Sequence, residues 1–261
     1  MNFFDTHSHY NDSRFAEDLE EIIEQTKVQG ITKFVCAGYN IESSKLAIEL
    51  AKKYDFIYAV CGISPNDVPE SEEEIQNLLI ELKELVNSNK KYVIAIGEIG
   101  LDYYWNKENK DLQKTLFIEQ IKFANEVNLP IQIHTREAID DTLNILRNVQ
   151  KPVKPGIFHC CPLNRELVKQ ALEIGFYISF AGPVTFKNSK NAEEIANMVP
   201  MEKMLIETDS PYLAPEPVRG TRNNSINVKH IAEKIANLRN VTIEEVANTT
   251  YNNAITVFNI L

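Results

Sequence analysis

The sequence predicts an α/β fold, a (β/α)₈ barrel of the TIM type, as a single domain over residues 1–261. Three observations lead to this prediction: short apolar runs alternate with amphipathic segments, there are eight such runs, and a unit recurs about every 33 residues. This alternation favours parallel βαβ units with right-handed crossovers. An open doubly wound sheet is the alternative, because period alone does not show closure. The absence of a glycine-rich phosphate-binding turn after any strand weakens its dinucleotide-binding version.

Each element is predicted from its residue pattern, in chain order. Residues 3–9 form the first strand, in which two aromatic residues precede His-Ser-His. Residues 15–28 have apolar side chains at helical spacing, and Gly30 ends that helix. The other predicted strands cover residues 33–38, 56–61, 92–97, 129–134, 156–159, 176–180 and 204–207, and the other predicted helices cover residues 43–53, 70–86, 110–127, 138–148, 165–174, 191–198, 228–238 and 243–258.

Composition narrows the class of protein. With 44% hydrophobic and 25% charged residues, the chain can bury a sizeable core. The net charge of −10 argues against non-specific coating of nucleic acid but permits one local binding site. No apolar leader or run of eighteen apolar residues is present, so we expect a cytoplasmic protein with no membrane partner. No obligate protein partner is evident. The four cysteines show no C-x-x-C spacing and are expected to be reduced and structural: Cys36, Cys61, Cys160 and Cys161.

Four of the five histidines end predicted strands. His7 and His9 are two residues apart on one predicted strand, so their side chains point to the same face of it. His134 and His159 end two later strands, and the carboxyl ends of all strands open onto one mouth in a parallel barrel. We expect these four imidazoles to meet there. His230 lies on a helix and is predicted to be inert.

Two acids follow predicted strands at the same mouth. Glu98 follows the strand over residues 92–97, and Asp209 follows the strand over residues 204–207. Considered alone, Asp209 is explained equally well as a turn residue or a helix cap, and Glu98 as a member of a structural ion pair. With four histidines beside them, they predict a metal centre. Six ligands exceed the needs of one ion, so two ions with Glu98 as the bridge are favoured, and the mixed donors leave magnesium, manganese and zinc open.

These residues lie in motifs that give the chain an end-to-end resemblance to the TatD-like metal-dependent deoxyribonucleases of the amidohydrolase superfamily. The arginine-containing stretch over residues 219–223 is similar to that family's basic loop. The motifs are Asp5-Thr6-His7-Ser8-His9, Gly97-Glu98-Ile99-Gly100-Leu101-Asp102-Tyr103, Ile133-His134-Thr135-Arg136, Phe158-His159-Cys160 and Glu207-Thr208-Asp209-Ser210-Pro211-Tyr212-Leu213.

The resemblance implies a ligand set and an activity. It assigns one metal to His7, His9, Glu98 and Asp209, and a second to Glu98, His134 and His159. It implies hydrolysis of DNA phosphodiesters, often as a 3′-to-5′ exonuclease, so DNA is the expected partner. Two stretches depart from the family pattern. Ser64 and Asn66 replace its usual histidines after the third strand and are candidate substrate-binding residues, since they can hydrogen-bond to a phosphate although they cannot carry a proton. Cys161-Pro162-Leu163 replaces its usual Phe-Ser-Gly.

The expected mechanism is attack on phosphorus by a metal-activated hydroxide, with Asp209 taking the proton from water. Arg136, Arg219 and Arg222 are candidate phosphate clamps, although each also suits a solvated loop. The aromatic residues at 103–105 suit either base stacking or burial. A metallo-amidohydrolase or deacylase acting on an ester or amide, such as an aminoacyl-nucleic acid, is the alternative, since the same chemistry serves a carbonyl. A non-catalytic metal- or nucleic-acid-binding protein is the third class.

Overall fold

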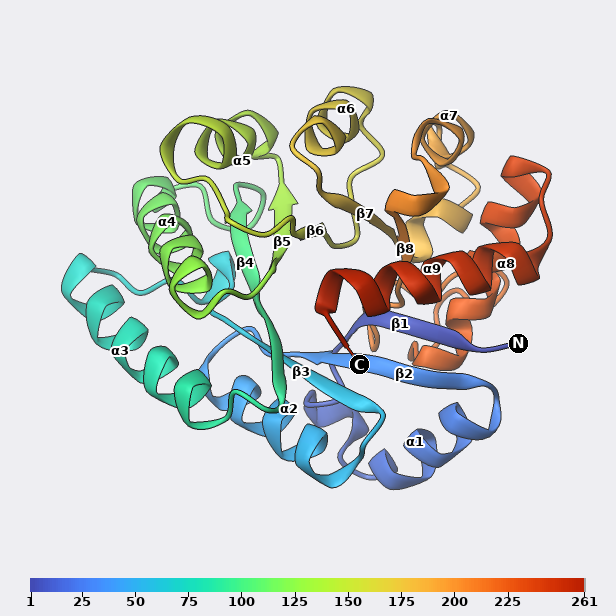
Figure 1. Ribbon diagram of the computed structural model, residues 1–261, viewed down its shortest axis with the longest axis horizontal. Helices are drawn as coiled ribbons and strands as arrows, with labels where there is room; N and C mark the ends of the chain where they lie inside the picture. The colour runs from blue at the N-terminus through green and yellow to red at the C-terminus, as the bar shows by residue number, and fades with distance from the viewer. Residues whose placement is uncertain (261) are drawn as a thin grey trace.

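The computed structural model describes residues 1–260, and its centre is an eight-stranded sheet in the order β1 to β8. All neighbouring pairs are parallel, and helices surround the strands (Figure 1). The predicted barrel is therefore confirmed. The strands are β1 (Phe3–Ser8), β2 (Ile31–Ala37), β3 (Ile57–Cys61), β4 (Val93–Asp102), β5 (Ile131–Arg136), β6 (Ile157–Phe158), β7 (Tyr177–Phe180) and β8 (Met204–Ile206).

The helices follow the strands as expected, with two after β8. None of the helices in residues 1–260 has both the length and the apolar character needed to cross a membrane. The helices are α1 (Leu19–Val28), α2 (Ile41–Lys53), α3 (Glu72–Ser88), α4 (Lys110–Val127), α5 (Ile139–Asn144), α6 (Arg165–Glu173), α7 (Ala192–Met198), α8 (Val228–Arg239) and α9 (Ile243–Phe258), with short 3₁₀ turns η1 (Ser13–Phe15), η2 (Pro65–Asp67), η4 (Gly182–Thr185), η5 (Met201–Lys203) and η6 (Ser225–Asn227), and a π-helical turn η3 (Ile145–Val149).

Most element boundaries lie within four residues of the sequence prediction, and two elements differ more in kind. Strand β4 does not end at Gly97 but continues through Glu98 to Asp102, because residues 99–102 pair with β5. The helix predicted over residues 138–148 is instead the short α5 followed by η3, in which the hydrogen bonding widens to the π pattern.

The end of the barrel where the strands begin is apolar. Phe4 packs in the barrel interior, where its ring centroid is 6.1 Å from that of Phe258 and 5.8 Å from that of Tyr251, both on α9. Helix α9 therefore covers this end (Figure 1). The same buried cluster includes Val35, Val60, Ala95, Ile157 and Leu205.

Bulges in two strands adjust the direction of side chains at the opposite, carboxyl end. Between Asp5 and Ser8, β1 has one more residue than the β2 segment it pairs with. Between Ile96 and Ile99, β4 has one more residue than β5. A bulge locally rotates the chain and re-aims a side chain. His7 lies in the first bulge and Glu98 in the second.

A few main-chain hydrogen bonds just beyond β8, together with side chains, join β8 to β1 in place of a continuous strand ladder. Within residues 1–260 the two strands are linked by an isolated bridge between Ser8 and Ser210, just beyond β8. The buried Asp5 carboxylate accepts hydrogen bonds from Thr208 N (2.9 Å), from the Thr208 hydroxyl (2.5 Å) and from the Ser225 hydroxyl (2.6 Å). Asp5 therefore anchors the segment that leads to Asp209.

Candidate metal centre

The carboxyl-end mouth of the barrel brings together the six residues that the sequence singled out as metal ligands. Their ring nitrogens and carboxylate oxygens form three overlapping triads, in each of which the atoms lie within 4.8 Å of one another. We call these six residues the mouth cluster. The triads are His7, His9 and Glu98; Glu98, His134 and His159; and His7, His159 and Asp209.

Glu98 lies between two pairs of histidines. Its Oε2 atom is 3.7 Å from Nε2 of both His7 and His9. Its Oε1 atom is 2.9 Å from Nδ1 of His134 and 3.2 Å from Nε2 of His159. One carboxylate oxygen thus faces each pair, which is the geometry of a bridging ligand. Gly97 permits this approach, since a Cβ there would lie 2.7 Å from Cβ of Gln132.

Asp209 completes the pair formed by His7 and His9. Its Oδ1 atom is 3.2 Å from His9 Nε2 and 3.7 Å from His7 Nε2. The residue has a φ of 55°, a left-handed conformation that aspartate adopts more readily than most residues. Its backbone N–H donates to the His7 carbonyl at 2.9 Å, which fixes the carboxylate beside the two imidazoles.

Neutral acceptors hold the outer nitrogens of His7 and His9. His9 Nδ1 lies 3.0 Å from the Ala37 carbonyl, and a carbonyl can only accept, so Nδ1 carries the hydrogen. His7 Nδ1 lies 2.8 Å from Oε1 of Gln132, whose amide nitrogen donates to the Thr6 carbonyl. In both rings the Nε2 lone pair therefore points into the mouth.

Carboxylates hold the outer nitrogens of the other two histidines. His134 Nε2 is 2.9 Å from Oδ2 of Asp102. His159 Nδ1 is 3.2 Å from Oε1 of Glu207, which also accepts the Cys160 N–H at 2.6 Å. The nitrogens left free again face the mouth.

The mouth cluster fits a divalent metal. Four imidazole lone pairs and two carboxylates converge on one small volume, and the Nε2 atoms of His7 and His9 lie only 3.1 Å apart. Neutral rings oriented from behind by acceptors are the usual arrangement of metal-binding histidines. These residues could hold zinc or manganese through nitrogen, and magnesium through oxygen.

The pKa shifts of the four histidines do not follow the two pairs. Burial lowers the pKa of His9, but Asp209 and Glu98 outweigh burial and raise it. Burial lowers the pKa of His134, but Asp102 and Glu98 outweigh burial and raise its pKa to about 9. Burial also opposes charge on His159, yet Glu98 and Glu207 raise its pKa well above the ordinary value. For His7, burial together with the neighbouring imidazoles lowers the pKa well below the ordinary value.

The five predicted substrate-binding residues occupy different environments. The buried Ser64 hydroxyl accepts the Asn66 N–H at 3.1 Å, and Asn66 itself is exposed. The exposed Arg136 stacks on Tyr104, and the exposed Arg219 stacks on Phe186. Arg222 is held by the carboxylate of Asp18 and by the Arg14 carbonyl, so its guanidinium is already bonded within the protein.

The aromatic run after β4 divides between burial and exposure. Tyr103 is buried, and its hydroxyl donates to Asp141 at 2.7 Å. Tyr104 and Trp105 remain 43% and 68% exposed. His230, on α8, lies outside the mouth cluster, and its nearest carboxylate is Glu233 at 4.0 Å.

Three residues that support the mouth cluster were not predicted from the sequence: Gln132, Asp102 and Glu207. Gln132 lies two residues before His134 on the same strand, so alternation was a signal that both face the barrel interior. Asp102 and Glu207 lie in the motifs over residues 97–103 and 207–213, but their pairing with His134 and His159 depends on contacts between different strands. No spacing in the sequence indicated those contacts.

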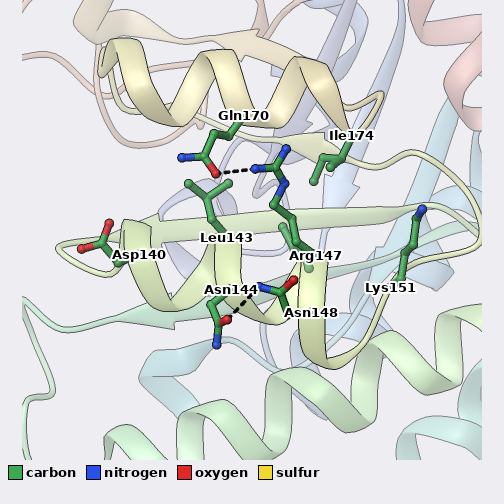
Figure 2. Close-up of a pocket in the computed structure, with 9 residues that line it drawn as sticks. Asp140, Leu143, Asn144, Arg147, Asn148, Lys151, Gln170 and Ile174 are labelled. Carbon is green, nitrogen blue, oxygen red and sulfur yellow. Dashed lines mark hydrogen bonds between the residues drawn. The ribbon is translucent and has the colours of Figure 1, made fainter.

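A separate pocket lies in the outer layer between α5, η3 and α6 (Figure 2). Its volume is about 570 Å³, and it contains none of the mouth cluster. Arg147 crosses it and donates to Gln170 at 2.8 Å and to Glu173 at 2.5 Å. Because these partners occupy its guanidinium, this pocket offers no comparable site.

Comparison with known proteins agrees with the geometry. The family model described as TatD related DNase matches residues 4–259. The metal-dependent hydrolase YabD of Bacillus subtilis is 44% identical over 257 residues, which cover 98% of this chain and 99% of YabD. The metal-dependent hydrolase YcfH of Escherichia coli K12 is 34% identical over 266 residues, which cover 100% of this chain and 97% of YcfH.

Solved structures share the fold. YJJV, a TatD homologue from Escherichia coli K12, superposes with a TM-score of 0.92 at 24% identity, covering 99% of this chain and 98% of its own. An organophosphorus hydrolase from Deinococcus radiodurans superposes with a TM-score of 0.68 at 13% identity, covering 98% and 92%. At these identities the likeness concerns the barrel alone.

Proposed function

The chain belongs to the TatD-related DNase family and is a metal-dependent hydrolase, and on this premise we propose that it cleaves DNA phosphodiester bonds, as a 3′-to-5′ exonuclease. The observation that carries the proposal is the position of Glu98, with one carboxylate oxygen toward each pair of histidines. This arrangement supports two divalent ions, one held by His7, His9, Glu98 and Asp209 and the other by Glu98, His134 and His159.

The protein's own residues divide the chemistry between them. When bound, such ions act as Lewis acids and make water a stronger nucleophile. Asp209 borders the pair formed by His7 and His9, and its side chain keeps 15% of its surface open. In the proposed reaction it takes the proton from the attacking water. Glu98 lies between the two histidine pairs and sets their separation. In the proposed reaction both pairs therefore act on the same phosphate.

Substrate positioning falls to side chains at the rim. Arg136 and Arg219 offer guanidinium groups that match the geometry of a phosphate. Arg222 takes part only if it leaves Asp18. Ser64 and Asn66 offer a hydroxyl and an amide in the segment after β3, where they would hydrogen-bond a phosphate oxygen without carrying a proton.

The proposal is tested on DNA labelled at its 5′ end, single-stranded and duplex, with magnesium, manganese or zinc. We expect a ladder of shortened labelled products together with 5′-mononucleotides, and complete loss of both in EDTA. His159→Ala should lose the activity, because it removes a ligand-type nitrogen. The matched control is His230→Ala, which removes a histidine outside the mouth cluster and should retain activity. Asp209→Asn should leave DNA intact, because an amide cannot accept the proton.

An aminoacyl ester and a small amide, tested beside the DNA, separate the competing activities. Intact DNA with turnover of the ester would replace the nuclease by a deacylase. Intact DNA with no turnover of any substrate, while metal analysis still finds bound ions, would make the protein a non-catalytic metal binder.

A further inference from the structure

The turn after β4 presents an exposed tryptophan beside an unpaired arginine. Trp105 is 68% exposed, although burying a tryptophan is among the most favourable contributions that a side chain makes. Its ring lies edge-on to Tyr104, with 4.8 Å between centroids. Arg136 Cζ lies 3.8 Å above the Tyr104 ring and 5.5 Å from the Trp105 ring. The three side chains form a surface that we call the aromatic platform.

The aromatic platform is rigidly held, so its exposure is built into the fold. Oδ1 of Asp102 accepts the N–H groups of Tyr104 at 2.9 Å and of Trp105 at 3.0 Å. The buried Gln113 side chain donates to the carbonyls of Asp102 at 3.0 Å and of Asn106 at 2.9 Å. Both sides of the turn are therefore fixed with the indole pointing outward.

The arginine of the platform is available to a ligand. Arg14, Arg147, Arg165 and Arg222 each pair with a carboxylate. Arg136 has no carboxylate partner within residues 1–260, and its guanidinium rests on an aromatic face instead. In a chain of net charge −10, such a group is a local attraction for an anion.

A single carboxylate connects the platform to the mouth cluster. While Oδ1 of Asp102 holds the turn, its Oδ2 atom is 2.9 Å from Nε2 of His134. Arg136 lies two residues after His134 on β5. The platform is thus adjacent to the half of the centre formed by His134 and His159.

Resting on the proposed DNase function, we infer that the aromatic platform binds one unpaired nucleotide beside the scissile phosphate. The base stacks on the open face of Trp105, and Arg136 donates hydrogen bonds to the neighbouring phosphate. Stacking on an aromatic side chain does not depend on the identity of the base. Base pairing would withhold the base from the indole, so the substrate of this site is a single-stranded end.

Trp105 is the only tryptophan of the chain, so its fluorescence reports on this site alone. The intact protein with magnesium is titrated with a phosphorothioate oligothymidylate, whose linkages resist hydrolysis. A second oligomer of the same length and charge carries abasic residues at its 3′ end. We expect saturable quenching by the first oligomer and binding at least about fivefold weaker by the second.

Variants test the two contacts separately, with binding followed by the anisotropy of a labelled oligomer. Trp105→Ala should weaken binding at least about fivefold, and Trp105→Phe should restore it, because a phenyl ring also stacks. Arg136→Gln should weaken binding in a salt-dependent manner. The matched control is Arg147→Gln, in the outer pocket of Figure 2, which should leave binding unchanged.

The outcomes distinguish this inference from the proposed function. Binding of the oligomer without quenching, or equal affinity for the abasic oligomer, would overturn the platform even if DNA is hydrolysed. Hydrolysis of DNA together with base-dependent quenching would support both proposals. Neither binding nor hydrolysis of any DNA would overturn both.

Discussion

The two halves of the mouth cluster differ in the groups that support their histidines from behind. His7 and His9 are held by a side-chain amide and a main-chain carbonyl, both uncharged. His134 and His159 are held by the carboxylates of Asp102 and Glu207. A carboxylate behind an imidazole makes the ring a more basic ligand and fixes its tautomer. We call the half with His7 and His9 the neutral half, because the groups behind its histidines carry no charge. Its own carboxylate, Asp209, faces the mouth directly.

The negative charge is therefore placed differently in each half of the mouth cluster. In the half with His7 and His9, the carboxylate of Asp209 faces the mouth, where in the proposed reaction it takes a proton. In the other half the carboxylates of Asp102 and Glu207 lie behind the two histidines, so in the proposed reaction they support the ligands without taking a proton. Substitutions that remove charge without changing shape test this distinction.

The largest expected effect comes from Glu98→Gln, since Glu98 faces both halves. An amide retains one acceptor oxygen and so cannot serve both histidine pairs. We expect metal content to fall in both halves and hydrolysis to fall on the order of a thousandfold, because Lewis-acid stabilisation is worth several kcal/mol. Elemental analysis and a DNA hydrolysis assay measure the two effects. A variant that keeps two ions and wild-type activity would remove Glu98 from the role of bridge.

Asp102→Asn should have the next largest effect. The asparagine oxygen would stay with the N–H groups of Tyr104 and Trp105, which would leave its NH₂ group facing His134. A donor at that position forces the ring hydrogen onto the nitrogen that faces the mouth. We expect metal affinity to fall by about 100-fold, measured by competition with a chelator. Unchanged affinity would show that the tautomer of His134 is set by another contact.

Glu207→Gln should cost less, about tenfold in metal affinity. The glutamine oxygen can still accept from both His159 and the Cys160 N–H, so the tautomer survives and only the charge is lost. Comparing this variant with Asp102→Asn in the same titration separates the effect of charge from the effect of tautomer. Equal losses in the two variants would contradict that separation.

Gln132→Met, in the neutral half, should mainly affect stability. It leaves the His7 Nδ1–H and the Thr6 carbonyl without a partner in a buried site, which costs about 1–3 kcal/mol. In a protein of this size that lowers the melting temperature by about 2–10 °C. Metal affinity should fall less than about tenfold. Calorimetric unfolding measures the melting temperature. A larger loss of metal affinity than in Glu207→Gln would contradict the expectation that the carboxylate-supported histidines depend more on their supporting groups.

The sequence predicted the barrel because its apolar runs and helical segments alternate strongly. It predicted the four histidines at strand ends, and the structure has them at or near the carboxyl ends of β1, β5 and β6. The strand predicted over residues 92–97 ends at Gly97, where the apolar run stops, whereas pairing with β5 continues to Asp102. The supporting groups Asp102, Glu207 and Gln132 were missed since their partners come from other strands. Periodicity also cannot show a bulge, because one inserted residue changes side-chain direction without changing composition.

The weakly paired junction between β8 and β1 has a consequence for how the chain is held together. His7 and His9 lie at one side of that junction and Asp209 at the other, and they come from opposite ends of the chain. A cation bound by all three would therefore cross-link two segments separated by most of the sequence. Closing so long a loop removes more freedom from the unfolded chain than closing a short one, as for a disulfide. The ion would then contribute to folding as well as to chemistry.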